Sequence, residues 1–146
     1  MGTERQGETM ADLLAHAKGV VDAFNNDDWD TAMKLVGDST YNEIGTQRSL
    51  RGAKAIVEAL QGWKAAMPDV TGTVKSAIEC DDRVVLEVEW EGTQTGEMVT
   101  EQGTIPPSGK RQRTPSAFLF DFENGKLKES RQYFDMLSFL KQIGAA

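Results

Sequence analysis

The apolar residues in the first half of the chain recur at intervals of three and four, which is the spacing of one buried helix face. This spacing predicts a helix over 10–24, a second short helix that Asp28 caps, and a third helix over 56–67. Residues 1–9 show no such period. We expect them to form a flexible tail in front of a single domain over 10–146.

The period then changes from helical spacing to alternation, which is typical of half-buried strands. Strands are predicted over 39–45, 70–77, 84–90, 111–122 and 126–134. Short turn sequences at 80–82 and 123–125 indicate hairpins. The polar residues 46–51 and the longer segment 96–109 are expected to be loops, and the second one is long enough to form a rim or lid.

Helices followed by antiparallel strands indicate an α+β domain. We expect a cone-shaped, curved and mostly antiparallel sheet, with three N-terminal helices packed on its concave face and a short C-terminal helix. The concave face of such a sheet is the usual location of a small-molecule pocket.

The composition narrows the range of partners. The chain has 146 residues and a formal net charge of -7, so we expect neither nucleic acid nor an anionic membrane surface as a partner. No apolar run approaches the roughly 20 residues that a membrane span needs, and the first residues lack a secretion signal, so we expect a cytoplasmic location. The single cysteine, Cys80, is expected to be buried or half-buried, and the single histidine, His16, to lie at the edge of a helix face. No residues have metal-ligand spacing, and we expect no metal and no cofactor.

Alternation assigns side chains to the pocket side of each strand. Together with Phe24 and Trp63 from the helices, the expected ligand-binding residues are Val88, Trp90, Ser116, Phe118, Phe120, Ser130 and Phe134. Ordinary core packing is the alternative for each aromatic side chain. Gln132 shares the face of Ser130, and a buried amide or hydroxyl without a partner costs on the order of 1–3 kcal/mol. These two side chains therefore either pair within the protein or meet a ligand.

Five separate segments carry a family signal. They are Ala23-Phe24-Asn25, residues 63–69, residues 92–97, residues 106–109 and the closing stretch 124–144. As a set they resemble the SnoaL-like polyketide cyclases, whose wider group has the nuclear-transport-factor-type cone and also includes ketosteroid isomerases and limonene epoxide hydrolases. The resemblance implies a deep pocket for a small molecule and a homodimer.

The resembling families have charged catalytic groups at positions where this chain has none. The aspartate that moves protons in the cyclases corresponds to Gln132, and an amide cannot take a proton at neutral pH. The base of the steroid isomerases corresponds to Asn42, and their tyrosine has no counterpart. The tyrosine of the epoxide hydrolases is similar to Tyr41, but Val88 and Trp90 stand where an arginine and an aspartate are expected.

Glu43 is the substitute acid that the sequence offers for the pocket. Asn42 faces the pocket if the strand over 39–45 is regular, whereas Tyr41 and Glu43 face it if the strand slips by one residue or bulges. The candidate catalytic residues are therefore Tyr41, Asn42, Glu43 and Gln132. Asp135, which follows the last strand, is instead expected to cap the closing helix.

Several functions stay open. The first is a small-molecule protein that catalyses proton transfer, as in aldol cyclisation or isomerisation, with Gln132 and Asn42 polarising a carbonyl and Glu43 as the base. The second is a binding protein without chemistry, and epoxide hydrolase-like activity is a further alternative. The last is a dimerisation module that uses Arg131 and Tyr133 on the outer face of the sheet.

Overall fold

A computed structural model describes the backbone of residues 2–146 and the side chains of residues 13–146. The helices are α1 (Gly2–Asn25), α2 (Trp29–Val36), α3 (Ala53–Ala66) and α4 (Met136–Gln142). The strands are β1 (Thr40–Glu43), β2 (Arg48–Arg51), β3 (Thr71–Cys80), β4 (Arg83–Thr93), β5 (Met98–Thr100), β6 (Gly103–Ile105), β7 (Arg111–Glu123) and β8 (Lys126–Phe134). The flexible tail expected over 1–9 lies outside the residues whose side chains are described.

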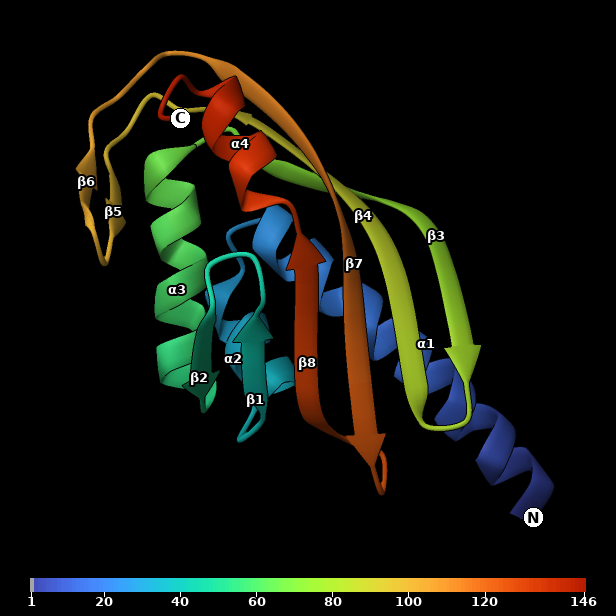
Figure 1. Cartoon of the computed structure of the whole chain (residues 1–146). Coiled ribbons are helices and arrows are strands. Elements are labelled where there is room, and N and C mark those ends of the chain that lie inside the picture. The colour runs from blue at the N-terminus through green and yellow to red at the C-terminus, as the bar shows by residue number, and fades with distance from the viewer. Residues whose placement is uncertain (1) are drawn as a thin grey trace.

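The alternating segments form one curved sheet that does not close on itself (Figure 1). Its six strands run in the order β2-β1-β8-β7-β4-β3. Neighbouring strands are antiparallel except β1 and β8, which are parallel. The prediction of an α+β domain with a curved, mostly antiparallel sheet is therefore confirmed.

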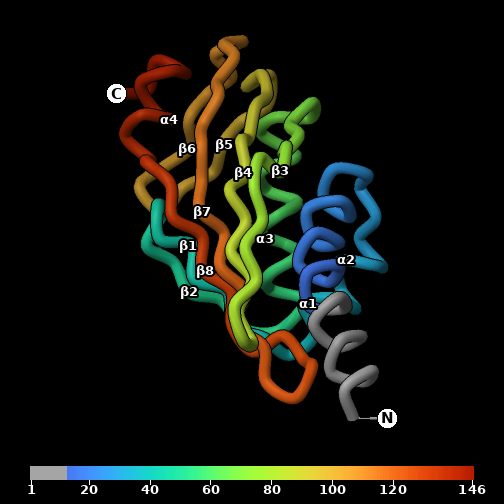
Figure 2. The backbone as a smooth tube through the Cα atoms, turned by 90° about the vertical axis from the view of Figure 1, so that its right-hand side faces the viewer, coloured from blue at the N-terminus to red at the C-terminus, as the bar shows by residue number. Residues whose placement is uncertain are grey.

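The helices α1, α2 and α3 lie together on one side of the sheet (Figure 2). α1 packs on β3 and β4, while α2 packs on α1 and α3. The side chain of Asn25 fixes the end of α1 to the edge strand, because its amide donates to the carbonyl of Gly72 at 2.9 Å and its oxygen accepts from the Gly72 N–H at 2.8 Å. α4 lies at the end of the sheet where β7 begins, and the side-chain oxygen of Gln142 accepts from the backbone N–H of Arg113.

Two segments expected as loops are strands. Residues 48–51 form β2, which pairs antiparallel with β1 after a turn in which Gln47 adopts a positive φ of 58°. β2 was not predicted because most of its side chains are polar, and an edge strand does not need an apolar face. Within 96–109, β5 and β6 form a hairpin instead of an open loop. Met98 buries its side chain there, and α3 contacts β5.

The caps and turns follow the sequence closely. Asp28 and Asp135 accept hydrogen bonds from the backbone N–H groups of Thr31 and Ser138, so both predicted helix caps are confirmed. Asn124 and Gly125 have positive φ angles of 53° and 78°, as a tight hairpin turn between β7 and β8 requires.

The predicted burial is wrong for the single cysteine and correct for the single histidine. Cys80 is exposed, so the expectation of a buried or half-buried cysteine is wrong: it ends β3 at a hairpin turn where even Ile78 is 60% exposed. His16 is half-buried, as expected for the edge of a helix face, and its Nε2 lies 2.6 Å from the carbonyl oxygen of Leu35. None of the described helices is both long enough and apolar enough to cross a membrane.

Candidate functional site

A cavity lies between the concave face of the sheet and the helices α1, α3 and α4, with a free volume of about 60 Å³. Seven residues predicted for the site line it: Phe24, Tyr41, Glu43, Trp63, Trp90, Gln132 and Phe134. The sequence does not single out the other lining residues, which are Leu60, Met67, Val70, Gln112, Thr114 and Phe139.

The carboxylate of Glu43 is buried at the polar wall of this cavity, with 1% of the residue exposed. One oxygen, Oε2, accepts from the Tyr41 hydroxyl and the Trp63 Nε1–H, both at 3.0 Å. The other, Oε1, accepts from the Thr46 hydroxyl at 2.6 Å and the Arg48 Nε–H at 2.9 Å. A carboxylate offers about four acceptor positions, and donors from the protein occupy all of them here.

Gln132 continues this network across the sheet. Its Nε2 donates to the Tyr41 hydroxyl at 2.9 Å, and its Oε1 accepts from the Trp90 Nε1–H at 2.6 Å and from the Ser116 hydroxyl at 3.0 Å. The network therefore runs from Glu43 through Tyr41 to Gln132, and joins residues of β1, β8, β7 and β4.

Tyr41 stays a neutral hydrogen-bonding group in this position. Burial and the negative charge of Glu43 raise the pKa of its hydroxyl well above the ordinary value. The hydroxyl is therefore suited to donating or sharing a hydrogen bond, and not to acting as a phenolate base.

Aromatic rings form the apolar walls. The ring of Trp63 packs edge-on against Phe134 and Phe139, with centroid distances of 6.1 and 5.4 Å. The ring of Phe24 packs edge-on against Trp90 at 5.2 Å. Edge-to-face contacts of this kind are a favoured arrangement of aromatic rings, and they make these walls of the cavity apolar.

Asn42 does not face the cavity. Its side chain lies on the opposite face of β1 and donates to Glu129 Oε2 at 2.6 Å, so the expectation of Asn42 in the pocket is wrong. Tyr41 and Glu43 face inward instead, which is the alternative register. Ile44, two residues after Asn42 on the same face, is 40% exposed.

Several predicted ligand-binding residues belong to the core instead of the cavity wall. Val88, Phe118, Phe120 and Ser130 are buried but do not line the cavity, and the rings of Phe118 and Phe120 stack on each other at 4.4 Å. Ser116 does not line the cavity, but its hydroxyl donates to Gln132 and accepts from the Trp90 Nε1–H.

Gln112 and Thr114 are the main polar residues that the sequence interpretation missed. They lie on β7 in the same alternation as Ser116, four and two residues earlier, and both are buried. Extending that alternation toward the start of the strand would have found them.

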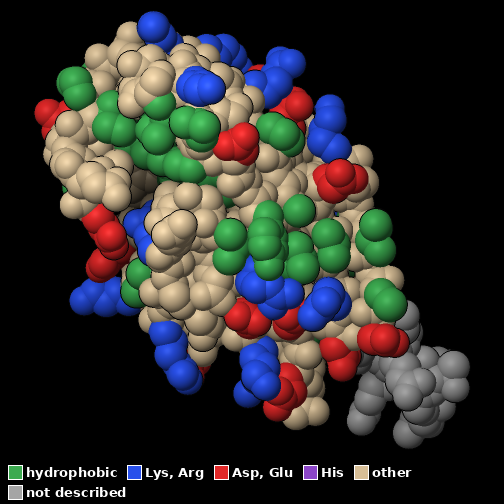
Figure 3. All heavy atoms as spheres, viewed as in Figure 1, with side chains coloured by type: hydrophobic (Ala, Val, Ile, Leu, Met, Phe, Trp, Pro, Cys, Tyr) green, Lys and Arg blue, Asp and Glu red, His purple; other side chains and the backbone are tan. Residues whose placement is uncertain are grey.

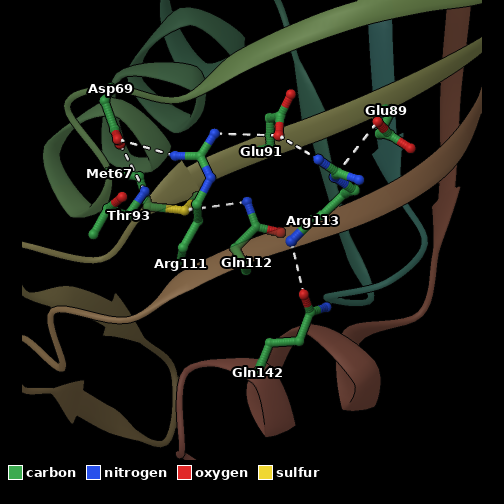
Figure 4. A network of polar contacts seen from close by, with 9 residues as sticks. All are labelled: Met67, Asp69, Glu89, Glu91, Thr93, Arg111, Gln112, Arg113 and Gln142. Atoms are coloured by element: carbon green, nitrogen blue, oxygen red, sulfur yellow. Dashed lines mark hydrogen bonds and ion pairs between the residues drawn. The ribbon is translucent and has the colours of Figure 1, made fainter.

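Ion pairs on the outer face hold the beginning of β7 against β4 (Figure 4). Arg111 pairs with Asp69 and Glu91 at 3.5 and 3.1 Å. Arg113 pairs with Glu91 and Glu89 at 3.3 and 3.7 Å. These arginines are more than half exposed, so the pairs orient the strand more than they stabilise it.

The described side chains, residues 13–146, contain no group of three or more His, Cys, Asp or Glu residues that could hold a metal ion. Glu43 is the only carboxylate among the described residues that line the cavity. Any chemistry at this site by the residues described therefore has a single carboxylate available.

Comparisons with known proteins agree with this architecture. The model of the SnoaL-like polyketide cyclase family matches residues 15–143. A comparison with curated protein sequences finds no significant match. Similar solved structures include AclR, a proposed hydroxylase from Streptomyces galilaeus, with 24% identity, 94% of this chain and 87% of that chain covered, and a TM-score of 0.77.

Two further solved structures have the same fold. IdmH, a proposed polyketide cyclase from Streptomyces antibioticus, is 23% identical, with 89% of this chain and 96% of that chain covered and a TM-score of 0.75. An LEH-like epoxide hydrolase from M. tuberculosis is 17% identical, with 92% and 90% covered and a TM-score of 0.69. These likenesses concern the fold, whereas the family match extends over nearly the whole sequence. The chain belongs to the SnoaL-like polyketide cyclase family.

Proposed function

We propose that the protein binds a hydrophobic, cyclic small molecule in the cavity and holds one of its carbonyl groups against Gln132. The observation that carries this proposal is the second N–H of the Gln132 amide. The side-chain amide has two N–H donors: one donates to the Tyr41 hydroxyl, and the other has no acceptor among the described residues. Gln132 lines the cavity between Trp90 and Phe134, so an apolar ligand with a carbonyl oxygen fits both the walls and the donor.

We further propose that Glu43 transfers a proton at the carbon next to that carbonyl. The C–H bond breaks, its proton moves to a Glu43 oxygen, and the electron pair moves to the carbonyl oxygen, which becomes an enolate that Gln132 stabilises. Return of the proton to another carbon completes an isomerisation. Alternatively, the enolate carbon attacks a second carbonyl of the same molecule, and the alkoxide that forms takes the proton back from Glu43, which completes an aldol cyclisation.

Glu43 needs a free lone pair for this step. Trp63 lies on α3, lines the cavity and donates to Oε2, so a ligand that turns the Trp63 indole aside would release one acceptor position. Protonation of Glu43 would in turn free the Tyr41 hydroxyl, because a neutral carboxyl no longer needs that donor. The freed hydroxyl would then donate to the enolate beside Gln132.

Binding without chemistry is the second candidate, and a specific observation favours it. All four acceptor positions of Glu43 already have protein donors, so none is free to receive a proton from a ligand until one donor leaves. Epoxide hydrolysis of the limonene type is not proposed, because Glu43 is the only carboxylate lining the described cavity and a second acid would be needed.

Deuterium exchange separates the two candidates. The wild-type protein and the Glu43→Gln variant are incubated in D₂O with 2-tetralone, a small bicyclic ketone, and incorporation next to the carbonyl is followed by NMR. Saturable exchange that Glu43→Gln lowers by at least about 100-fold supports proton transfer. Glu87→Gln, on the outer face of β4, is the control and should leave the rate unchanged. Binding of 2-tetralone without any exchange supports the second candidate, and absence of binding would contradict both.

A homodimer through the outer face of the sheet stays a prediction. A band of hydrophobic side chains crosses this face between charged ones (Figure 3). Tyr133 on β8 and Leu137 on α4 are 44% and 55% exposed. The test compares the molecular mass of the wild-type protein and the Tyr133→Asp variant by analytical sedimentation. A dimer built on this face should dissociate in the variant. The cytoplasmic location likewise stays a prediction.

A further inference from the structure

A second amide in the cavity lacks a strong acceptor. Gln112 is 1% exposed, and its Oε1 accepts from the Thr114 hydroxyl at 2.6 Å, which fixes the orientation of the amide. Its Nε2 lies 3.4 Å from the sulfur of Met67 and has no other described partner (Figure 4). A thioether is a weak acceptor, so this buried N–H donor is held far more loosely than the rest of the polar groups in the cavity.

Gln112 on β7 and Gln132 on β8 line the same cavity. Gln112, Thr114 and Met67 all lie on the cavity wall, and Gln132 is held there by Ser116. Gln112 and Ser116 are four residues apart on one face of the strand, which corresponds to roughly 13 Å between their α-carbons. The two amides therefore present donors at separate positions on the wall of one cavity.

The charge around Gln112 limits what this donor can hold. No lysine or arginine is among the described residues that line the cavity. The neighbouring Arg111 and Arg113 point to the outer face, where Asp69, Glu89 and Glu91 pair with them (Figure 4). An anionic ligand group would be buried there without a counter-charge, whereas a neutral carbonyl needs only the N–H donor.

We infer that Gln112 is a specificity-determining residue that binds a second carbonyl of the ligand. The ligand is then an elongated, neutral, mainly apolar molecule with a carbonyl toward each end, one at Gln132 and one at Gln112. This inference rests on the proposed function, because it assigns the far end of the same ligand. At about 60 Å³ the cavity is smaller than such a ligand, so binding also requires its walls to open, as when the Trp63 indole turns aside.

The contact with Met67 explains why an empty cavity tolerates the buried donor. The sulfur gives the Gln112 N–H a partner in the free protein. A ligand carbonyl replaces a weak acceptor with a strong one, so little is lost when the contact with sulfur breaks.

Two isosteric probes test the inference. 1,4-Diacetylbenzene carries a carbonyl at each end. In 4-isopropylacetophenone, which has a similar shape, a methyl group replaces one of the two carbonyl oxygens, so that one acetyl group becomes isopropyl. Affinities for both are measured by calorimetry with the wild-type protein. The diketone should bind about tenfold more tightly than the monoketone, which is the usual effect of one buried hydrogen bond.

Two variants of Gln112 identify the residue responsible. Gln112→Met, which is similar in volume, should lower the affinity for the diketone to that for the monoketone and leave the monoketone unchanged. Gln112→Glu keeps an oxygen that accepts from the Thr114 hydroxyl but loses the N–H donor, so it should lower the affinity for the diketone at least as much. This variant replaces Gln112→Met in the test if the methionine variant does not fold. Thermal unfolding of each variant establishes that it is folded.

The outcomes distinguish failure of this inference from failure of the proposed function. If Gln132→Met weakens both probes while Gln112→Met weakens neither, the cavity binds a carbonyl at Gln132 but the assignment of Gln112 is wrong. Equal wild-type affinities for the two probes also overturn it. If neither probe binds the wild-type protein, the proposed function and the inference fall together.

Discussion

The indole of Trp90 occupies the space in which Gly72 would carry a side chain. A β-carbon at position 72 would lie 2.5 Å from Cζ3 of the ring, closer than such atoms approach in proteins. The same glycine is held by Asn25 through both its N–H and its carbonyl. Gly72 therefore connects the end of α1 to the ring that donates to Gln132.

Adding a methyl group at this glycine should disturb the site from outside it. Gly72→Ala forces the Trp90 ring to move, because the ring is rigid and cannot bend away, at a cost of about 1–3 kcal/mol. We expect weaker binding of 4-isopropylacetophenone and altered tryptophan fluorescence, because the bond from Trp90 to Gln132 is strained. Gly62→Ala is the control: no atom lies within 4 Å of that position on α3, and alanine should stabilise the helix by up to about 1 kcal/mol. Equal behaviour of the two variants would contradict this account.

Arg48 is expected to contribute to stability as the counter-charge of a buried carboxylate. Arg48→Gln removes the cation that Glu43 contacts at 2.9 Å and leaves a buried charge with neutral donors only. We expect a loss of about 2 kcal/mol in urea unfolding, less than for a fully buried pair because the Arg48 side chain is 36% exposed. Arg51→Gln, on the same strand, breaks a pair with Asp38 whose side chains are 74% and 86% exposed. Its stability should stay within about 0.5 kcal/mol of wild type, and a comparable loss there would argue against a special role for Arg48.

Tyr41 should give the protein an alkaline limit of stability. The raised pKa means that the folded protein holds the hydroxyl proton more tightly than the unfolded chain, whose tyrosine has the ordinary value of 10.0. The stabilisation is therefore complete below pH 10.0 and is lost as the pH rises toward the folded pKa. The slope is at most about 1.4 kcal/mol per pH unit.

Urea unfolding as a function of pH tests this limit. Tyr41→Phe should be less stable at pH 8, because Glu43 and Gln132 each lose a partner, but should show a shallower fall above pH 10. Tyr133→Phe, which removes a half-exposed hydroxyl, should retain the dependence that Tyr41 causes. If the free energy of unfolding falls equally in wild type and Tyr41→Phe above pH 10, groups other than Tyr41 cause the alkaline limit.

Gly96, two residues before β5, should tolerate substitution poorly. A β-carbon there would lie 2.0 Å from the carbonyl oxygen of Ala65, a backbone atom that cannot move without shifting α3. The Gly96 N–H also donates to the carbonyl of Ala66. Gly96→Ala should therefore cost about 3 kcal/mol and increase hydrogen exchange over 97–105. The exposed neighbour provides the control, because Glu97→Ala should change stability by less than about 0.5 kcal/mol.

The fold could be predicted because its signals are local. The helical period before Pro68 and the alternation after it are properties of neighbouring residues, and so are the Asn124-Gly125 turn and the caps at Asp28 and Asp135. β2 escaped prediction because its half-exposed face has no apolar stripe to detect.

The register of β1 could not be predicted, because its inward face carries a charge. Burying Glu43 is unfavourable unless donors surround it, and those donors come from a turn, an edge strand and α3, as far as 20 residues away in sequence. Neither spacing nor composition contains that information. For the phenylalanines of β7, alternation gave the correct face but not the position along the strand. Phe118 and Phe120 therefore fell in the core, while Gln112 and Thr114 line the cavity.

The parallel pairing of β1 with β8 also affects the order in which the protein can fold. Tyr41 and Gln132 are 91 residues apart in sequence, yet they share a hydrogen bond across that pairing. During synthesis, β1 and its buried acid are made long before the strand that completes their surroundings. Contacts of such long range slow folding, because a large loop must close before they form. The cavity is thus assembled only when β8 inserts between β1 and β7, and a nascent chain that lacks β8 has no binding site.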